Sequence, residues 1–112
     1  MKRAEILDTA KTCVCGQREQ DYGSPEDNFQ EIADLWASYL DENITAIDVA
    51  MMMALLKIAR IKTGTATEDS FVDLAGYAAC GGEIAHMQYL RQNGLPALQS
   101  ILNDSKDGES CD

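Results

Sequence analysis

The sequence has few of the features that mark membrane-spanning, secreted or nucleic-acid-binding proteins. No apolar run approaches the roughly 20 residues that span a bilayer, and the first residues, MKRAEILDTAK, lack the apolar core of a signal peptide. Lysine and arginine are scarce, with 9 against 19 acidic residues and a net charge of −10, whereas binding to DNA or RNA phosphates requires clustered cations. We therefore expect a soluble cytoplasmic protein that binds neither membranes nor nucleic acids directly.

Patterns for zinc, disulfides and common catalytic sites are also missing. The four cysteines, Cys13, Cys15, Cys80 and Cys111, form no CxxC pair, and His86 is the only histidine. Structural zinc sites gather four such ligands at close spacing, and no secretory signal accompanies these cysteines. We expect free thiols, and a surface or satisfied core position for His86. No Ser-His-Asp set, P-loop or GxGxxG motif is present.

Apolar residues recur at helical spacing through most of the chain, without strand-like alternation. The predicted helices, placed by this spacing and by capping residues, cover residues 2–16, a segment from Pro25, a segment from Thr45 to Ile61, residues 67–90 and a short fifth stretch, 95–103. The segment GQREQDYGS, residues 16–24, indicates a polar loop. The sequence predicts an all-α fold, an antiparallel four-helix bundle over residues 1–102, with a disordered acidic tail over residues 103–112.

The predicted helix over residues 46–61 is apolar on almost every side. Its only charged residues are Asp48, Lys57 and Arg60, and three methionines follow one another at residues 51–53. A helix of this kind is expected to be central, with neighbours on several sides, and its methionines to fill the core. Because a chain this short offers few neighbours, the pattern also favours a homodimer or a higher homo-oligomer.

Two cations of that helix and two acids of the next are spaced to meet. Folding the chain back at the turn near residues 64 and 65 brings Lys57 opposite Asp73. In the same register Arg60 meets Asp69. One interpretation is a pair of interhelical salt bridges. The other is a functional site, in which the carboxylates hold Mg²⁺ while Lys57 and Arg60 bind phosphate.

Further candidates for such a site lie earlier in the chain. Additional carboxylates would come from Asp27, Glu31 and Asp34, although Asp27 also suits a helix cap and the other two suit a solvated face. Tyr22 lies beside a glycine turn, where its ring could stack on a base or cover the end of the core.

Three blocks of sequence resemble a known group of proteins. YGSPEDNFQEIADLW, DVAMMMALLKIAR and DSFVDLAGYAA, in this order, resemble a family of short phage and prophage proteins of unknown function, over about residues 4–80. Lys57 and Arg60 match the pattern of that family. The resemblance implies a protein of the host cytoplasm. The family is in turn similar to MazG-like all-α NTP pyrophosphohydrolases and to nucleotide-modification-associated phage domains.

The MazG-like resemblance implies a reaction and a set of residues. Such enzymes cleave nucleoside triphosphates to monophosphate and pyrophosphate, using Mg²⁺ held by an ExxE pair and an ExxD pair, and they work as dimers or tetramers. DSFVDLAGY resembles the ExxD helix, with Asp73 at the Asp position, Ser70 where Glu is expected and Asp69 one residue earlier. On the other helix Glu31 and Asp34 give ExxD in place of ExxE.

The leading prediction is therefore a phage-type, Mg²⁺-dependent (deoxy)nucleoside triphosphate pyrophosphohydrolase or a nucleotide-binding relative. Its assigned residues are Glu31, Asp69 and Asp73 in catalysis, the same three with Asp34 as metal ligands, Lys57 and Arg60 on the phosphates, and Tyr22 under the base. The alternative is a non-catalytic acidic phage protein that binds and inhibits a host defence complex, in the manner of an anti-CRISPR or a nucleic-acid mimic.

Overall fold

The computed structural model describes the backbone of residues 1–107 and the side chains of residues 1–16, 18–94, 102 and 103. This part of the chain is all-helical, as predicted. The helices in chain order are α1 (Arg3–Cys15), α2 (Gln17–Tyr22), α3 (Pro25–Leu40), α4 (Ala46–Thr63) and α5 (Thr67–Asp107). Within residues 1–107, none of these helices combines the length and the apolar character needed to cross a bilayer.

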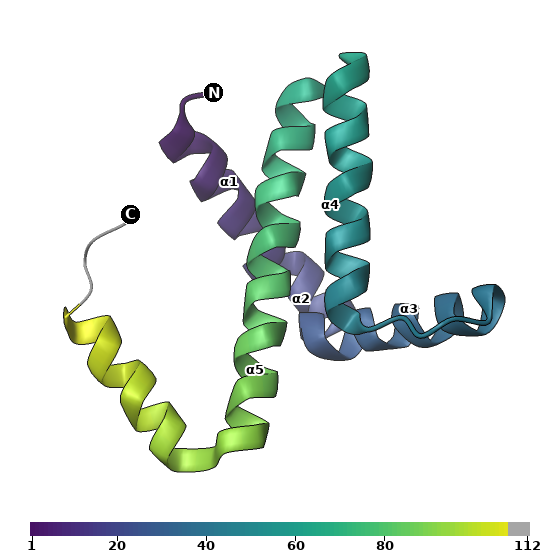
Figure 1. Ribbon diagram of the computed structural model, residues 1–112. Helices are drawn as coiled ribbons and strands as arrows, with labels where there is room; N and C mark the ends of the chain where they lie inside the picture. Colours follow the sequence, from purple (N-terminus) through teal and green to yellow (C-terminus); the bar gives the residue numbers. More distant parts are fainter. Residues whose placement is uncertain (108–112) are drawn as a thin grey trace.

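Helices α4 and α5 form a long antiparallel pair (Figure 1). A capping box begins α4: Thr45 Oγ1 accepts a hydrogen bond from the Asp48 amide at 3.0 Å, and Asp48 Oδ2 accepts one from the Thr45 amide at 2.9 Å. The helix ends at Gly64, whose φ of 78° is a left-handed conformation that glycine adopts without steric cost. The short turn that follows returns α5 along α4, as the sequence predicts.

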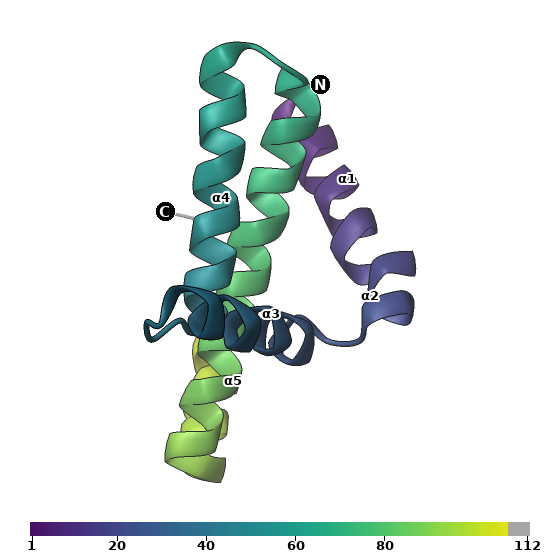
Figure 2. The same cartoon turned by 90° about the vertical axis from the view of Figure 1, so that its right-hand side faces the viewer.

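The other helices pack around this pair in different directions. Helix α1 packs on α5, and α3 runs across the N-terminal end of α4 and the middle of α5, with its C-terminal half projecting past α4 (Figures 1 and 2). Ser24 caps α3, because its Oγ accepts a hydrogen bond from the Asp27 amide at 3.3 Å. Glu26, in the first turn of α3, forms an ion pair with Arg91 of α5. The predicted antiparallel four-helix bundle is therefore not confirmed, although its α4–α5 pair is present.

Residues 17–22 and the long helix α5 differ in detail from the predicted helices. Residues 17–22 form α2, so the prediction of a polar loop is wrong there. Gly16 ends α1, and the segment QREQDY is rich in residues of good helix propensity. A kink at Gly94, with φ of 72°, divides α5 into the predicted fourth and fifth helices. The predicted tail, 103–112, begins within the second of these, and residues 108–112 lie outside the described part.

The core lies where α3 meets the α4–α5 pair. Its buried residues are Phe29 and Ala33 of α3, Ala46, Val49 and Ala50 of α4, and Cys80 and Ile84 of α5. Helix α4 contributes only small or medium side chains here, and Gly81 of α5 faces them. A Cβ atom on Gly81 would lie 3.2 Å from Ala50 Cβ and 3.1 Å from Met51 Cε, so the glycine permits a close approach of the two helices.

The larger side chains of α4 are mostly exposed. These exposed residues are Met51, Met52, Leu55, Leu56 and Ile58. Of the three methionines only Met53 packs against the core. The prediction that all three fill the core is therefore wrong for Met51 and Met52. Within the described helices α4 contacts α3 and α5 only, and the side of α4 away from them is uncovered.

Candidate functional site

One of the two predicted charge pairs is formed. Lys57 Nζ lies 2.9 Å from Asp73 Oδ2, with the lysine side chain 13% exposed and the aspartate side chain 42% exposed. Arg60 and Asp69 are both exposed, and neither forms an ion pair with any described residue. The register predicted for the helical hairpin is thus confirmed at Lys57, while the two residues nearer the turn extend into solvent.

The predicted metal ligands do not assemble within the described residues. Asp69 and Asp73 lie on α5, whereas Glu31 and Asp34 are exposed on α3, where Asp34 Oδ1 accepts a hydrogen bond from Gln30 Nε2 at 2.9 Å. No three acidic, cysteine or histidine side chains in the described part of the chain are grouped so that they could hold a metal ion. The described residues of one chain therefore do not fit a Mg²⁺ centre.

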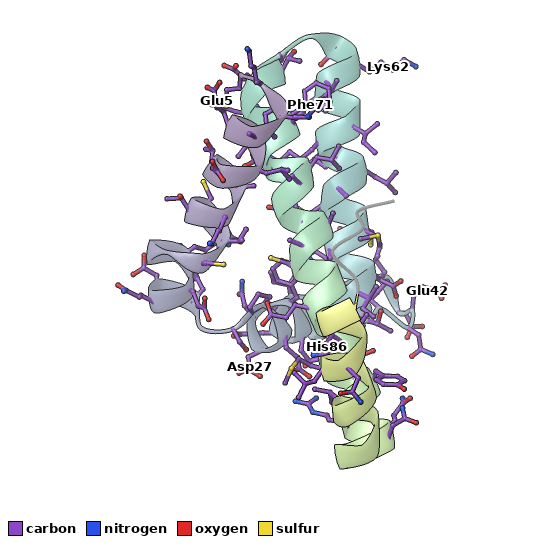
Figure 3. The ribbon with its side chains drawn as sticks, turned by 90° about the vertical axis from the view of Figure 1, so that its left-hand side faces the viewer. Glu5, Asp27, Glu42, Lys62, Phe71 and His86 are labelled. Atoms are coloured by element: carbon purple, nitrogen blue, oxygen red, sulfur yellow. The ribbon has the colours of Figure 1, made fainter. Side chains whose placement is uncertain are left out.

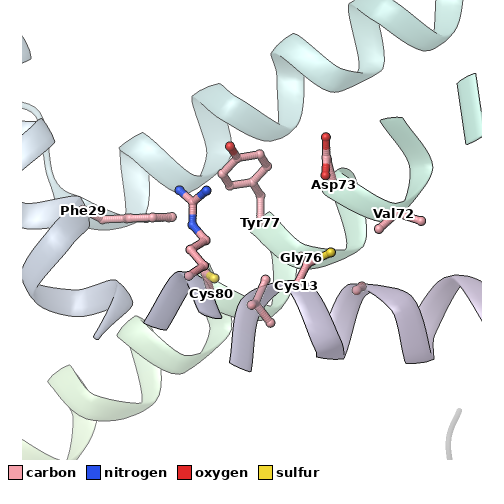
Figure 4. Close-up of a pocket in the computed structure, with 10 residues that line it drawn as sticks. Cys13, Phe29, Val72, Asp73, Gly76, Tyr77 and Cys80 are labelled. Carbon is pink, nitrogen blue, oxygen red and sulfur yellow. The ribbon is translucent and has the colours of Figure 1, made fainter. Parts of the chain in front are cut away.

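A cavity lies among α1, α2, α3 and α5, next to the Lys57–Asp73 ion pair (Figure 4). Val14, Phe29 and Val72 contribute apolar walls, and Arg18, Asp73 and Tyr77 contribute polar groups. The cavity volume is about 60 Å³. That volume holds roughly four to six water molecules, so the cavity accommodates one small group rather than a whole nucleotide.

Arg18 of α2 supplies a positive charge to the cavity. Its guanidinium lies 5.6 Å from the centre of the Tyr22 ring, one helical turn further on, in a cation–π contact. No described carboxylate forms an ion pair with Arg18, although Glu19 lines a smaller cavity beside it. Because Lys57 offsets the charge of Asp73, the guanidinium is the charged group of the cavity lining that has no ion-pair partner among the described residues. A small anion is the complementary ligand.

Tyr77 and Asp73 extend from successive turns of α5 towards the same side, as Figure 4 shows. The Tyr77 ring is held by Phe29, with 6.2 Å between the ring centroids and 41° between the ring planes. A tyrosine hydroxyl can donate a hydrogen bond to an anion. The cavity therefore offers a second donor beside the guanidinium.

Two thiols also line the cavity. Cys13 is exposed and Cys80 is buried, and both are free, as is Cys15. Burial raises the pKa of the Cys80 thiol, and the neighbouring Arg18 opposes this with a smaller effect. The Cys80 thiol therefore stays protonated at neutral pH and is a poor nucleophile. The prediction of free thiols is confirmed for these three cysteines, and Cys111 lies outside the described residues.

Arg18 is not among the site residues predicted from the sequence. Arg18 and Tyr22 are four residues apart, a spacing that makes them neighbours on a helix, but their segment was expected to be a loop. Tyr22, the predicted stacking residue, lines the smaller cavity beside Arg18 and lies against the guanidinium. His86 is exposed on α5, close to α3 and away from the α4–α5 turn, so of the two predicted positions, surface and core, it occupies the surface (Figure 3).

Comparison with known proteins identifies the family. The model of the domain of unknown function DUF6378 matches residues 5–85, which include the cavity residues and the Lys57–Asp73 pair. The chain belongs to the DUF6378 family. Its relatives include the Gene 55 protein of Mycobacterium phage D29, 48% identical over 75 residues, and the Gene 55 protein of Mycobacterium phage L5, 49% identical over 92 residues.

The DUF6378 chain spans about half the length of these curated relatives. The matched segments cover 67% and 81% of this chain, but 50% and 57% of the D29 and L5 proteins. No solved structure matches the chain. The resemblance to phage proteins of unknown function is confirmed, whereas the comparisons do not show a similarity to MazG-like enzymes.

Proposed function

We propose that this DUF6378 chain binds a nucleoside or deoxynucleoside phosphate, with one phosphate group in the cavity on Arg18. The observation that carries the proposal is a guanidinium that forms no ion pair with a described residue, at a cavity of single-group size. A guanidinium presents a planar fork of donors that matches two phosphate oxygens. Asp73 does not oppose the anion strongly, because Lys57 neutralises it at 2.9 Å.

The base of the ligand would lie outside the cavity, on Tyr22. This ring is exposed and has the Arg18 guanidinium over it, so its opposite face is the one available to a ligand. Stacking of a base on an aromatic side chain contributes about 1–3 kcal/mol and tolerates any base. One helix thus supplies both the phosphate contact and the stacking surface.

Hydrolysis of the triphosphate is not part of the proposal. The Mg²⁺ chemistry implied by the MazG-like resemblance needs carboxylates from two helices, and the described residues of one chain form no such group. Lys57 is engaged with Asp73, and Arg60 is exposed without an ionic partner among the described residues. We therefore assign the phosphate contact to Arg18.

Titration calorimetry of an Arg18→Gln variant tests this assignment. Inorganic pyrophosphate and the eight common ribo- and deoxynucleoside triphosphates serve as probes. Loss of hydrogen bonds to a charged group costs about 1.5–3 kcal/mol, so the dissociation constant of the bound probe should rise roughly 10- to 100-fold. Arg3→Gln, at an exposed arginine of α1, is the matched control and should bind as the wild type does. Equal affinities of Arg18→Gln and wild type would overturn the assignment.

The net charge of −10 favours a second candidate, the binding of a basic host protein. Glu31 and Asp34, exposed on α3, would then act in recognition rather than in catalysis. The probe is a purified host DNA-binding protein held on double-stranded DNA. Its displacement by the wild type, and not by a Glu31→Lys/Asp34→Lys variant, is the result expected of a nucleic-acid mimic. Displacement by neither chain would reject that function.

A further inference from the structure

The uncovered side of α4 carries a regular apolar stripe between two opposite charges. Asp48, Met52, Leu55, Ala59 and Lys62 follow one another at alternating steps of four and three residues, and all five are exposed. This is the heptad spacing by which two helices pack side by side. The large apolar residues that flank the stripe are Met51, Leu56 and Ile58.

We propose that this stripe binds the same stripe of a second copy of the chain, with the two α4 helices antiparallel about a two-fold axis at Leu55. Leu55 lies seven residues from Asp48 and seven from Lys62. An antiparallel pair centred on Leu55 therefore brings Asp48 opposite the partner's Lys62, and the symmetry repeats this contact. A parallel pair in register would place like charges together instead.

The side chains at both ends of the stripe are available for this contact. Asp48 uses Oδ2 for the capping box, which leaves its other carboxylate oxygen for a cation. Lys62 forms no ion pair with a described residue, and Figure 3 shows it extending away from the end of α4. The charges that would meet across the two-fold axis are thus exposed and complementary in the single chain.

Helix α3 gives the second copy a further contact. Its C-terminal half projects past α4 on the side away from α5 (Figures 1 and 2). Three exposed apolar residues lie on this projecting half: Leu35, Tyr39 and Leu40. A second α4 laid along the stripe would occupy the corner between α4 and α3. A foreign partner would have no need of charges placed symmetrically about Leu55, which favours a second copy.

Sedimentation equilibrium of the full chain tests the interface. The wild type should be a dimer, and Leu55→Glu should be a monomer, because the two-fold axis sets the two new carboxylates against each other. Leu7→Glu is the matched control: Leu7 on α1 is 63% exposed and Leu55 is 62% exposed, so solubility changes equally. A monomeric wild type, or a Leu55→Glu chain that stays dimeric and helical, would overturn the proposal.

Lys62→Gln tests the direction of the helices without disturbing the fold. In the antiparallel pair this change removes two attractive contacts, each of modest strength at a surface, so the dissociation constant should rise about threefold. In a parallel pair it would remove a repulsion and tighten the dimer. Lys11→Gln, at an exposed lysine of α1, corrects for the change in net charge. A constant equal to or below that of Lys11→Gln would reject the antiparallel register.

Discussion

The two sides of α4 are built from different residues. The side against α3 and α5 buries Ala46, Val49, Ala50 and Ala54, whereas the opposite side exposes larger residues such as Leu55 and Met52. Full burial of a Leu or Met side chain contributes about 1.5–3 kcal/mol to stability. A helix with neighbours on one side only would therefore be more stable if its large apolar residues faced those neighbours and its small residues faced solvent. Helix α4 thus combines close packing within the chain with an exposed apolar surface, on which the proposed second copy would pack.

The largest difference in the cost of a substitution is expected between an isoleucine packed against the covered side of α4 and one on its exposed side. Ile84 of α5 is fully buried in the core against α4, and Ile58 on α4 is 47% exposed. Ile84→Ala should lower the free energy of unfolding by about 3 kcal/mol, because it removes buried methylene groups and leaves a cavity. Ile58→Ala should cost less than about 1 kcal/mol when both are measured by urea denaturation in the monomeric Leu55→Glu background. Equal losses would contradict the contrast between the two sides.

Two adjacent glycines of α5 allow the close packing of α4 against α5 to be tested, because one faces α4 and the other does not. A Cβ atom on Gly82 meets nothing within 4 Å, so Gly82→Ala should stabilise the chain by about 1 kcal/mol through helix propensity. On Gly81 the new atom would lie 3.2 Å from Ala50 Cβ, which is fixed to the backbone of α4. Gly81→Ala should therefore destabilise by about 1 kcal/mol. Thermal unfolding of both variants checks this, and similar stabilisation by the two would show that the helices are not closely packed there.

A double-mutant cycle measures the ion pair that joins the two helices. Lys57→Met and Asp73→Asn should show a coupling energy of about 1 kcal/mol. Lys57 is largely buried, but solvent at the 42% exposed Asp73 screens the attraction. The equivalent cycle with Arg60→Met and Asp69→Asn should give about zero, because these side chains do not meet. Equal coupling in the two cycles would mean that the register differs from the one observed.

The smallest effect concerns pH. Burial raises the pKa of Cys80 above its ordinary value of 9.0, so the thiol ionises at a lower pH in the unfolded chain than in the folded chain. The contribution of Cys80 to stability is therefore complete below that ordinary value and is lost as the pH rises through the folded pKa. Urea denaturation between pH 8 and 10 should show a decline that is weaker in Cys80→Ala and unchanged in Cys13→Ala. An identical decline in all three chains would contradict this role of burial.

Much of the fold follows from local patterns in the sequence. The ends of α3 and α4 are specified by Ser24, Thr45 and Gly64, which act within a turn of their helix. Which side of α4 is covered could not be predicted, because the sequence of an apolar helix does not indicate whether the neighbour that covers it belongs to the same chain. For that reason Met51 and Met52 were assigned to the core.

Only the part of the candidate site that lies on two helices consecutive in the sequence could be predicted. Lys57 and Asp73 meet because a short turn determines the register of α4 and α5. Arg18 was missed because α2 is a short polar helix between two glycines, and such helices depend on tertiary contacts. Glu31 and Asp34 were assigned to a metal with α5, but α3 runs across the hairpin rather than along it, so these acids do not align with Asp73.

Nucleotide binding itself is tested most directly by calorimetric titration of the wild-type chain with the eight common nucleoside triphosphates, once in Mg²⁺ and once in EDTA, followed by chromatography of the recovered ligand. We predict that at least one triphosphate binds in both conditions, through Arg18 and Tyr22, and is recovered intact. Absence of binding for every triphosphate would contradict the proposed function. Release of monophosphate in Mg²⁺ alone would contradict the restriction to binding and would require a metal site that one chain does not assemble in its described residues.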